Sequence, residues 1–378
     1  MRRSLLRASL VLALAVSLGG SAEPLSKPLR AAVSAGPGTT VVVENLAGRL
    51  EVVKGGGTEA ILSGAARSDA GSAAESQTLL DGLAIHVRES GGAAILHVTY
   101  PVEKGPFRCE KEGSSRSRWN RSSSTVEYQG RQVKVQEGGD APLLQADLTL
   151  EVPAGVAVRV VNHVGRVAAR GVGGALDVKT TSADVSAETI AGGLDVQTGS
   201  GDVRVRGASE IDVRTGSGDV EAEQVSGAAS VRTGSGDVRL GRSESSKVSV
   251  TTGSGDIELD GVAGDLELST GSGDVRGRAV AGVSRLDVGT GRGDVSLSLE
   301  TTAFHGGTVE TASGDVSLAL VSSPALRLSV STASGDIDAS GLDLTKVERR
   351  GERSLVADVR GGGPLLTVST ASGGVRIR

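Results

Sequence analysis

The stretch Thr198-Gly199-Ser200-Gly201-Asp202-Val203 decides the fold, because variants of it recur through the chain that follows. The pattern of Thr, small residues, Gly, Asp and then Val or Ile occurs eight times between Thr198 and Ile337, at spacings of 17 to 21 residues. A fixed period near twenty is typical of solenoids, in which each unit buries its apolar face against its neighbours. The repeat therefore predicts an architecture and says little about chemistry.

Apolar and polar residues alternate on both sides of each turn. Val196 and Leu194 stand two and four residues before the first Thr, and Val203 and Val205 follow the first Asp with the same period. Alternation of this kind marks half-buried strands, and glycine suits the turn because it adopts positive φ. We therefore predict an all-β, right-handed parallel β-solenoid of stacked 17–21 residue rungs, spaced about 4.8 Å apart.

The residue two places after each Asp alternates in charge from one rung to the next. If the rungs stack in register, each charge lies between two opposite charges, whereas a slip by one rung places like charges together. We interpret this column as register control, and a plain solvated outer face is an alternative that fits equally well. The column consists of Arg204, Glu221, Arg239, Glu258 and Arg276.

The repeat also sets the predicted domain organisation. Residues 161–378 are predicted as regular repeats, and residues 39–160 as irregular N-terminal rungs of the same stack, with a surface excursion at 103–140 around Trp119. Residues 23–38 are predicted as a linker. The last repeat, Thr370 to Val375, lacks the Asp, and we expect it to be the terminal rung, where Arg376 and Arg378 discourage pairing with another chain.

The first 22 residues combine basic residues, a short apolar run and small residues before Glu23. We interpret residues 1–22 as a cleaved signal peptide, which predicts an exported protein that is periplasmic, cell-surface or secreted. Without Arg2, Arg3 and Arg7 the chain has 37 basic and 45 acidic residues, a net charge of about −8 that argues against a nucleic-acid partner. No later segment approaches the roughly 20 apolar residues of a membrane span.

Composition limits both the core and the chemistry. The chain has five aromatic residues, one of them Trp119, so we expect a thin core of Val, Leu, Ile, Ala and Thr. Cys109 is the single cysteine, which excludes an intramolecular disulfide and leaves an idle thiol or pairing between chains as alternatives. We predict no catalytic residues and no cofactor, since the histidines are scattered without a partner at ligand spacing: His86, His97, His163 and His305.

The recurring Asp is the one candidate site. Carboxylates stacked every ~4.8 Å repel by roughly 1 kcal/mol per neighbouring pair even in water, so something must compensate. We expect backbone N–H groups of the turn to do so. Calcium is the alternative, because it can bridge carboxylates, although calcium-binding β-rolls have a period about half as long. The column comprises Asp202, Asp219, Asp237, Asp256, Asp274, Asp294, Asp315 and Asp336.

Three segments together resemble a known family. They are the run from Val42 to Val52, the step from Leu150 to Gly155, and the Thr-Gly-Ser-Gly-Asp-Val repeats. These resemble the bacterial "putative adhesin" family, also called the toast-rack domain, a domain of unknown function. The resemblance implies an exported or envelope-associated β-solenoid with no established catalytic activity. The excursion at 103–140 and the lack of an Asp-bearing turn between Ile337 and Val375 depart from the pattern.

Two classes of function remain after this reasoning. We favour a non-enzymatic, exported scaffold or adhesin-like protein of the cell envelope that binds an envelope protein or a surface glycan. The alternative is a polysaccharide lyase or hydrolase, since parallel β-helices often carry such chemistry. That alternative requires a groove lined by aromatic residues, and the chain has none between Tyr128 and Phe304.

Overall fold

The computed structural model describes residues 24–110, 122–137, 139–301, 303–322 and 324–378. The chain divides into two compact units, unit 1 (Met1–Asp184) and unit 2 (Val185–Arg378). Regular structure in the described residues is almost entirely β, as the alternation predicts. The predicted signal peptide, residues 1–22, lies outside the described residues.

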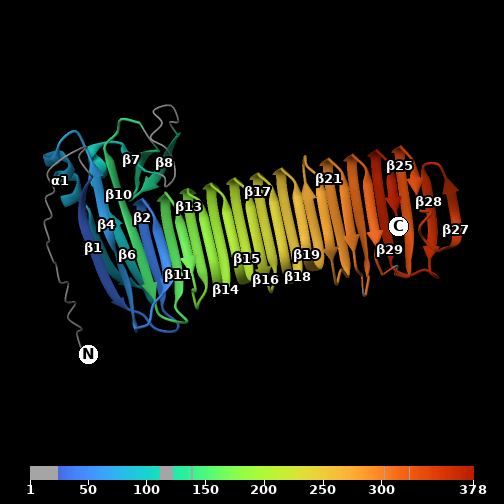
Figure 1. Ribbon diagram of the computed structural model, residues 1–378, viewed down its shortest axis with the longest axis horizontal. Helices are drawn as coiled ribbons and strands as arrows, with labels where there is room; N and C mark the ends of the chain where they lie inside the picture. The colour runs from blue at the N-terminus through green and yellow to red at the C-terminus, as the bar shows by residue number, and fades with distance from the viewer. Residues whose placement is uncertain (1–23, 111–121, 138, 302, 323) are drawn as a thin grey trace. The chain divides into compact units, whose positions relative to one another are not determined.

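In unit 2 each repeat supplies one strand that leads into the Gly corner and one that leaves it. The leading strands lie side by side in a first row, and the leaving strands form a second row (Figure 1). The pairs between successive repeats are parallel and in register, so that Thr198 faces Thr215 and Thr215 faces Thr233. The strands of the repeats are β14 (Val185–Ser200), β15 (Val203–Ser217), β16 (Val220–Val225), β17 (Ala229–Ser235), β18 (Val238–Ser254), β19 (Ile257–Thr270), β20 (Val275–Val280), β21 (Arg285–Arg292), β22 (Val295–Leu299), β23 (Gly306–Ser313), β24 (Val316–Leu320), β25 (Leu326–Ser334), β26 (Ile337–Asp338), β29 (Leu365–Ser372) and β30 (Val375–Ile377).

The core of unit 2 lies between the two rows and consists of the predicted apolar columns. Val196 and Val213, two residues before their Thr, are 0% exposed, and the same holds for Val203 and Val238 after the corner. Each buried side chain packs against its counterparts one rung away, which is how a thin repeat without large aromatic residues excludes water.

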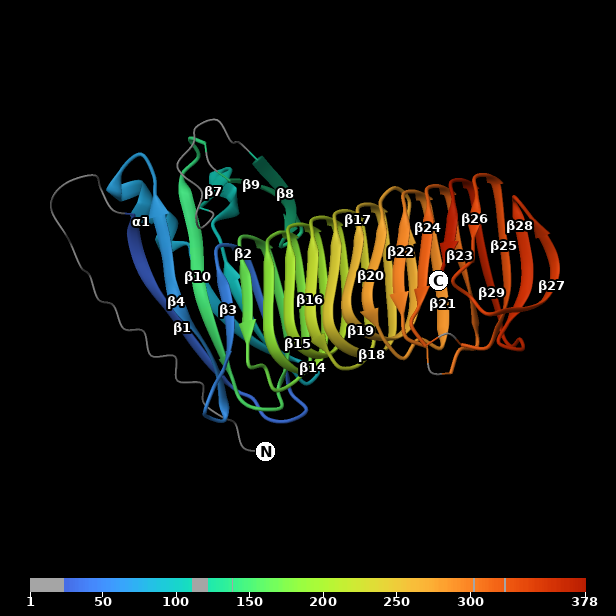
Figure 2. The ribbon, with the colours of Figure 1, turned by 45° about the vertical axis from the view of Figure 1, so that its right-hand side comes forward.

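The far end of unit 2 differs from the prediction. Strand β29 pairs with β23 on one side and with β25 on the other, and β30 likewise lies between β24 and β26, so the last repeat is an interior rung (Figure 2). The prediction of a terminal rung with Arg376 and Arg378 at the edge is therefore wrong. The segment from 344 to 359 forms β27 (Leu344–Gly351) and β28 (Ser354–Val359), an antiparallel hairpin that pairs with β25.

Unit 1 mixes parallel and antiparallel pairs. One row has the order β1-β4-β10-β3-β12 and the other β5-β6-β2-β11-β13, with antiparallel pairing at β1/β4, β4/β10 and β5/β6. The strands are β1 (Leu25–Ser34), β2 (Thr40–Ala47), β3 (Leu50–Lys54), β4 (Glu59–Asp69), β5 (Ala84–Ser90), β6 (Ala93–Thr99), β7 (Phe107–Cys109), β8 (Ser122–Tyr128), β9 (Arg131–Glu137), β10 (Leu143–Val152), β11 (Ala157–Val164), β12 (Val167–Arg170) and β13 (Leu176–Ser182).

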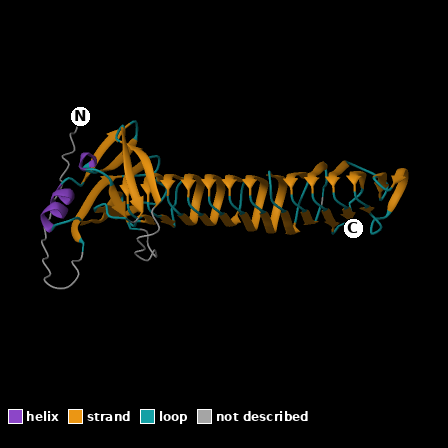
Figure 3. Cartoon of the chain, turned by 90° about the horizontal axis from the view of Figure 1, so that it is seen from above, coloured by secondary structure: helices purple, strands orange, loops and turns teal. Residues whose placement is uncertain are grey.

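A helix that the prediction missed lies in unit 1. Helix α1 (Ala73–Asp81) is drawn in purple in Figure 3. Ser72 caps it by accepting the N–H of Glu75, and Lys27 Nζ donates to the carbonyls of Leu80 and Leu83 beside its C-terminal end. The sequence carried a signal for this helix, because Ser72 followed three residues later by Glu75 is a capping-box pattern.

Two further segments differ from their predictions. Residues 23–38, predicted as a linker, contain β1, whose Leu29 and Val33 are buried and which pairs along its whole length with β4. Within the excursion at 103–140, the described residues form part of the 3-10 turn η1 (Val102–Lys104), strand β7 and the β8–β9 hairpin. Trp119 and its neighbouring arginines lie outside the described residues.

None of the helices in the described part of the chain is long and apolar enough to cross a membrane.

Candidate functional site

The predicted Asp column forms a ladder of hydrogen bonds along the corner of unit 2. Oδ1 of Asp202 accepts the backbone N–H of Asp219 at 3.2 Å, and this contact repeats from rung to rung at 2.8–3.0 Å up to Asp315. Asp315 accepts the N–H of Gly374 at 2.8 Å, because the rung of β29 and β30 intervenes before Asp336. The backbone N–H groups that we expected thus do face the carboxylates, but each belongs to the neighbouring rung.

The second oxygen of several column carboxylates contacts arginine. Oδ2 of Asp237 lies 3.1 Å from Arg239, and Oδ2 of Asp256 lies 3.2 Å from Arg276, which also pairs with Asp274. A calcium ion bridging these carboxylates would have to displace such contacts. No group of three His, Cys, Asp or Glu residues in the described ranges has a geometry that could hold a metal ion. The calcium alternative stays a prediction.

Threonine and glycine complete the corner. The Thr252 hydroxyl, 2% exposed, donates to the carbonyl of Gly236 in the neighbouring rung at 3.1 Å, and Thr270 and Thr290 repeat this contact with their own neighbours. Neither corner glycine of this rung leaves room for a side chain, since a Cβ at Gly253 would lie 2.5 Å from the Gly234 carbonyl oxygen. Gly255 has φ +157°, and a Cβ there would lie 2.1 Å from the Gly236 carbonyl oxygen, so no side chain fits between rungs.

The outer face of the second row carries the alternating charge column. Arg204 faces Glu221 in the register, Glu221 faces Arg239, and Arg239 faces Glu258. The ion pairs are loose, with 3.7 Å between Arg204 and Glu221 and 3.5 Å between Arg239 and Glu258, and all four side chains are at least two-fifths exposed. The opposite charges stack in register, and this arrangement agrees with both interpretations, register control and a plain solvated outer face. Exposed pairs of this kind contribute only a few tenths of a kcal/mol each.

A second charge column runs beside the first, two residues further along each strand. Arg206 faces Glu223, Glu223 contacts both Arg206 at 3.2 Å and Arg242 at 2.5 Å, and Asp260 faces Arg278. The pKa of Glu223 is lowered, chiefly by its hydrogen bond to Arg242. The second column matches the sign of the first on four of the five rungs and is interrupted on β18, where Gly241 faces both Glu223 and Asp260. The face therefore presents bands of alternating charge, and the band on β18 consists of Arg239 with Arg242 beside the gap. The first column was predicted from the sequence, and the second was not.

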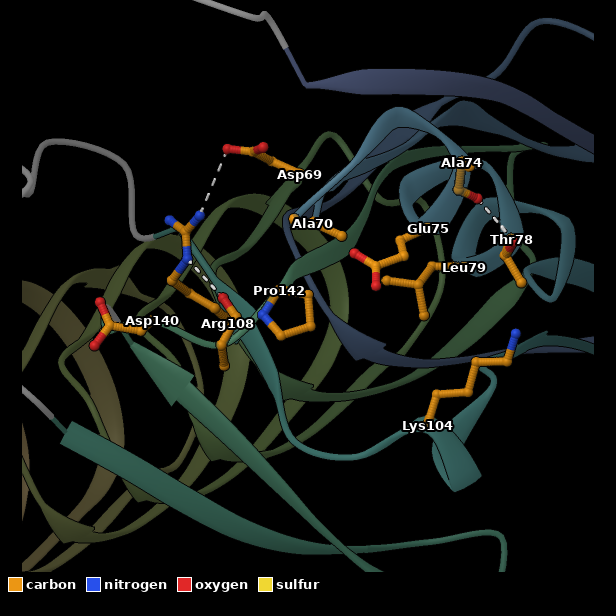
Figure 4. Close-up of a pocket in the computed structure, with 13 residues that line it drawn as sticks. Asp69, Ala70, Ala74, Glu75, Thr78, Leu79, Lys104, Arg108, Asp140 and Pro142 are labelled. Carbon is orange, nitrogen blue, oxygen red and sulfur yellow. Dashed lines mark hydrogen bonds and ion pairs between the residues drawn. The ribbon is translucent and has the colours of Figure 1, made fainter.

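Unit 1 holds a cavity of about 690 Å³ between α1, the end of β4 and the start of β10 (Figure 4). Arg108 is the best-anchored side chain in it, with contacts to Asp69 at 4.0 Å, to Glu110 at 3.2 Å and to the Ala141 carbonyl at 3.3 Å. No base–nucleophile arrangement occurs among the lining residues, which include Asp69, Glu75, Leu79, Lys104, Arg108 and Pro142. No sequence pattern predicts this cavity, because separate chain segments enclose it.

Two of the histidines that were expected to be scattered, His97 and His163, contact the same side chain, Tyr128, in unit 1. His97 Nδ1 lies 2.8 Å from Glu44, and its ring stacks on Tyr128, with ring centroids 5.6 Å apart. The ring of His163 packs edge-to-face against Tyr128, with ring centroids 5.7 Å apart. Burial lowers the pKa of His163, and the hydrogen bond from His97 lowers the pKa of Glu44. Gln129 also contacts His97, so the β8–β9 hairpin covers this cluster.

Cys109 is buried, and burial raises the pKa of its thiol to about 12. A thiol with so high a pKa is protonated at neutral pH and unreactive. Of the two alternatives drawn from the sequence, the buried position favours the idle thiol over pairing between chains.

Comparisons with known proteins complete the description of the site. A family model described as Toastrack DUF4097 matches residues 175–378, which include all of unit 2. No curated protein matches. The chain is similar to a solved structure named "Putative lipid binding protein" from Parabacteroides distasonis ATCC 8503, with 11% identity, coverage of 93% of this chain and 96% of that one, and a TM-score of 0.35.

Two further solved structures carry the name "putative adhesin". One is from the same Parabacteroides distasonis strain, with 10% identity, coverage of 93% of this chain and 97% of that chain, and a TM-score of 0.31. The other is from Bacteroides fragilis NCTC 9343, with 8% identity, coverage of 93% and 97%, and a TM-score of 0.24.

Proposed function

Because the chain belongs to the Toastrack DUF4097 family, we propose that it is a non-enzymatic, exported protein that serves the cell envelope as an adhesin-like or scaffold protein. Membership of the family confirms the resemblance drawn from the sequence. We further infer that the stack is right-handed, since crossovers between parallel strands are right-handed in nearly all proteins.

The observation that carries the proposal is the banded outer face of the second row. The bands are arginine on β15, glutamate on β16, arginine on β18, glutamate and aspartate on β19 and arginine on β20. Bands of one sign therefore recur every two rungs, about 9.6 Å apart. The backbone ladder holds the spacing fixed, so the face is already organised before a partner arrives, which lowers the entropy cost of binding.

Such a face suits an extended partner whose charges alternate at a similar interval. A surface glycan or an envelope protein with alternating charged groups meets that description, and each rung adds one weak contact to the total. Because the contacts are ionic and exposed, we expect affinity to fall steeply as salt rises. Electrostatic matching also selects among partners, since like charges that meet cost free energy.

A band-exchange variant tests the proposal. Arg204 and Arg206 are changed to Glu, and Glu221 and Glu223 to Arg, which leaves composition and net charge unchanged and reverses two bands. We expect the purified wild-type chain to bind envelope polysaccharide or protein fractions saturably, and the variant to bind at least tenfold more weakly at low salt.

Two results would contradict the proposal. Equal binding by a folded band-exchange variant would exclude this face as the contact surface. Turnover of an envelope polysaccharide by the wild-type chain would favour the lyase or hydrolase alternative, so each fraction is assayed for products as well as for binding.

A further inference from the structure

In unit 1 two arginines stand where the corners of unit 2 carry aspartate. Gly48-Arg49-Leu50 and Gly165-Arg166-Val167 have the backbone of the Gly-Asp-Val corner, with φ of +119° at Gly48 and +121° at Gly165. Leu50 donates to the carbonyl of Arg166 at 2.9 Å and Val167 to that of Asp184 at 2.9 Å, as Val203 donates to Asp219 in unit 2. The same corner is therefore built with the opposite charge.

Arginine in place of aspartate removes carboxylate oxygens, which are hydrogen-bond acceptors, from the corner. Asp147, on β10, still behaves like a column aspartate, because its Oδ1 accepts the N–H of Arg49 at 2.9 Å. Residue 49 is an arginine, so it has no carboxylate to offer to the N–H of Arg166. The corner thus lacks the carboxylate that the repeat places between neighbouring rungs, and two guanidinium groups extend from it instead.

A cavity of about 560 Å³ lies at this place. Its lining includes both corner arginines, Arg67 from β4, and the backbone of the two corner glycines. A volume of this size lies within the range of small-ligand sites and exceeds the size of a bare inorganic ion. The chain therefore provides a hollow where a negatively charged group would meet arginine side chains.

Asp147 and Glu110, two of the three carboxylates that line the cavity, have partners among the neighbouring side chains. Asp147 Oδ2 pairs with Arg67 at 2.7 Å, both of its oxygens accept from Gln145, and Glu110 pairs with Arg108 at 3.2 Å. Arg166 is exposed, and its side chain makes no hydrogen bond or ion pair with any residue that the structure describes. The Arg166 guanidinium is therefore available to a bound anion, and Asp184, one rung away in the same lining, is the carboxylate that competes with that anion.

We propose that this cavity binds an oxyanion, a sulfate or phosphate group, either free or carried on a polymer. The group takes the place of the missing column carboxylate: its oxygens accept the N–H of Arg166 and hydrogen bonds from the guanidinium group of Arg166, and the charge of Arg49 in the same lining favours an anion there. Planar guanidinium groups match tetrahedral oxyanions through paired hydrogen bonds. This site lies within unit 1 and does not depend on the charge bands proposed as the contact surface of unit 2.

The test uses the wild-type chain and Arg166→Asp, which recreates the Gly-Asp-Val corner of the repeat. Binding of sodium sulfate and sodium phosphate is measured by calorimetry and by thermal shift, against sodium chloride at equal ionic strength. We expect saturable binding to the wild type and at least a tenfold loss in the variant, whose melting temperature without anion is unchanged or higher. Arg30→Asp, an equal charge change at an exposed position of β1, should bind as the wild type does.

Dextran sulfate against neutral dextran separates the two sources of the group. Binding of both the inorganic ions and the sulfated polymer supports a site for the free ion, and binding of the polymer alone supports a polymer-borne group. The proposal is overturned if neither the ions nor the sulfated polymer binds the wild type, or if Arg166→Asp binds as well as Arg30→Asp does.

Discussion

The carboxylate Oδ1 of Asp256 accepts the backbone N–H of Asp274, one rung further along the corner, at 2.8 Å. The bond explains how acidic residues can stack at the spacing of β-strands. Each carboxylate satisfies a backbone donor that the corner leaves outside the strand ladder, and this offsets the repulsion between neighbouring aspartates. The recurring Asp is thus explained by the backbone before any ligand is considered.

Asp256→Ala removes this acceptor, and we expect it to lower the free energy of unfolding by about 1–2 kcal/mol, as for a hydrogen bond to a charged group at a half-exposed position. Asp256→Asn keeps an oxygen in place and should cost less. Urea unfolding measures both. Asp260→Ala, at an exposed position without a ladder contact, serves as the control, and an equal loss in Asp260→Ala would contradict the role of the ladder.

Gly255→Ala should be among the most damaging single changes in unit 2. Its φ is +157°, and a Cβ would meet the carbonyl oxygen of Gly236 at 2.1 Å, so the rungs would have to separate. We expect a loss of more than about 2 kcal/mol. Gly289→Ala is the matched control, since nothing lies within 4 Å of a Cβ there. The prediction fails if the two variants melt at the same temperature.

Thr252→Val keeps the volume of a buried side chain and removes the hydroxyl that donates to the Gly236 carbonyl at 3.1 Å. Because that carbonyl then loses a donor inside the corner, we expect a cost of about 1–2 kcal/mol. Thr251→Val changes the neighbouring exposed threonine and should be close to neutral. Thermal unfolding of the pair provides the comparison, and a neutral Thr252→Val would show that the hydroxyl contributes nothing.

The stability of unit 1 should fall as the pH falls below about 6.5. Burial lowers the pKa of His163 below its ordinary 6.5, so the unfolded chain takes up the proton first. The stabilisation is present above pH 6.5 and is lost as the pH falls toward the lowered value. Tyr128 and Thr181 contact this ring, and the charge of Glu44 acts on it. Glu44, whose pKa is lowered from 4.5, adds its own loss of stability only below about pH 4.5.

His163→Gln should therefore flatten the stability profile between pH 7 and 5, as measured by urea unfolding at closely spaced pH values. His86→Gln, a change at an exposed histidine, should leave the slope of the wild type intact. If the His163→Gln profile keeps that slope, another group is responsible for it.

A chelator should leave the melting temperature unchanged. The oxygens of the Asp column already accept backbone N–H groups and contact arginines, so calcium has no open set of ligands there. A cation at a hundred times its dissociation constant would add about 2.7 kcal/mol of stability. Calorimetry with added calcium or with EDTA would detect such a shift, and its appearance would revive the calcium alternative.

The regular part of unit 2 was predictable because its physics is local and repeated. Val196 and Val213 alternate with polar neighbours, and the opposite charges of Arg204 and Glu221 face each other, so one rung predicts the next. For the contact of Asp256 with Asp274, the type of bond, a carboxylate that accepts a backbone N–H, was predictable, but the residue that donates was not. The sequence shows that a carboxylate needs a donor, but which rung supplies the donor depends on the geometry of the corner.

Features that depend on single contacts between distant parts of the chain could not be predicted from the repeat pattern. His97 and His163 are 66 positions apart in the sequence. Their rings both contact Tyr128, because β6, β2 and β11 are neighbours and the β8–β9 hairpin brings Tyr128 over them. The cavity at Arg166 likewise needs β4, β10 and two corners. Its sequence signal, arginine in place of the corner aspartate, becomes meaningful only once the register of unit 1 is known.

The interior position of β29 sets an order of events during synthesis. Strand β25 leaves the ribosome before β29, yet it docks on the outer side of β29, and 59 residues separate Asp315 from its partner Gly374. The rungs up to β23 can assemble as they emerge. Strand β25 and the β27–β28 hairpin that pairs with it reach their final places only after β29 has been made, because β29 lies between β23 and β25. The last repeat therefore completes the end of the stack. Until β29 pairs with β23 and β25, those two strands each lack a neighbour and can pair with other strands.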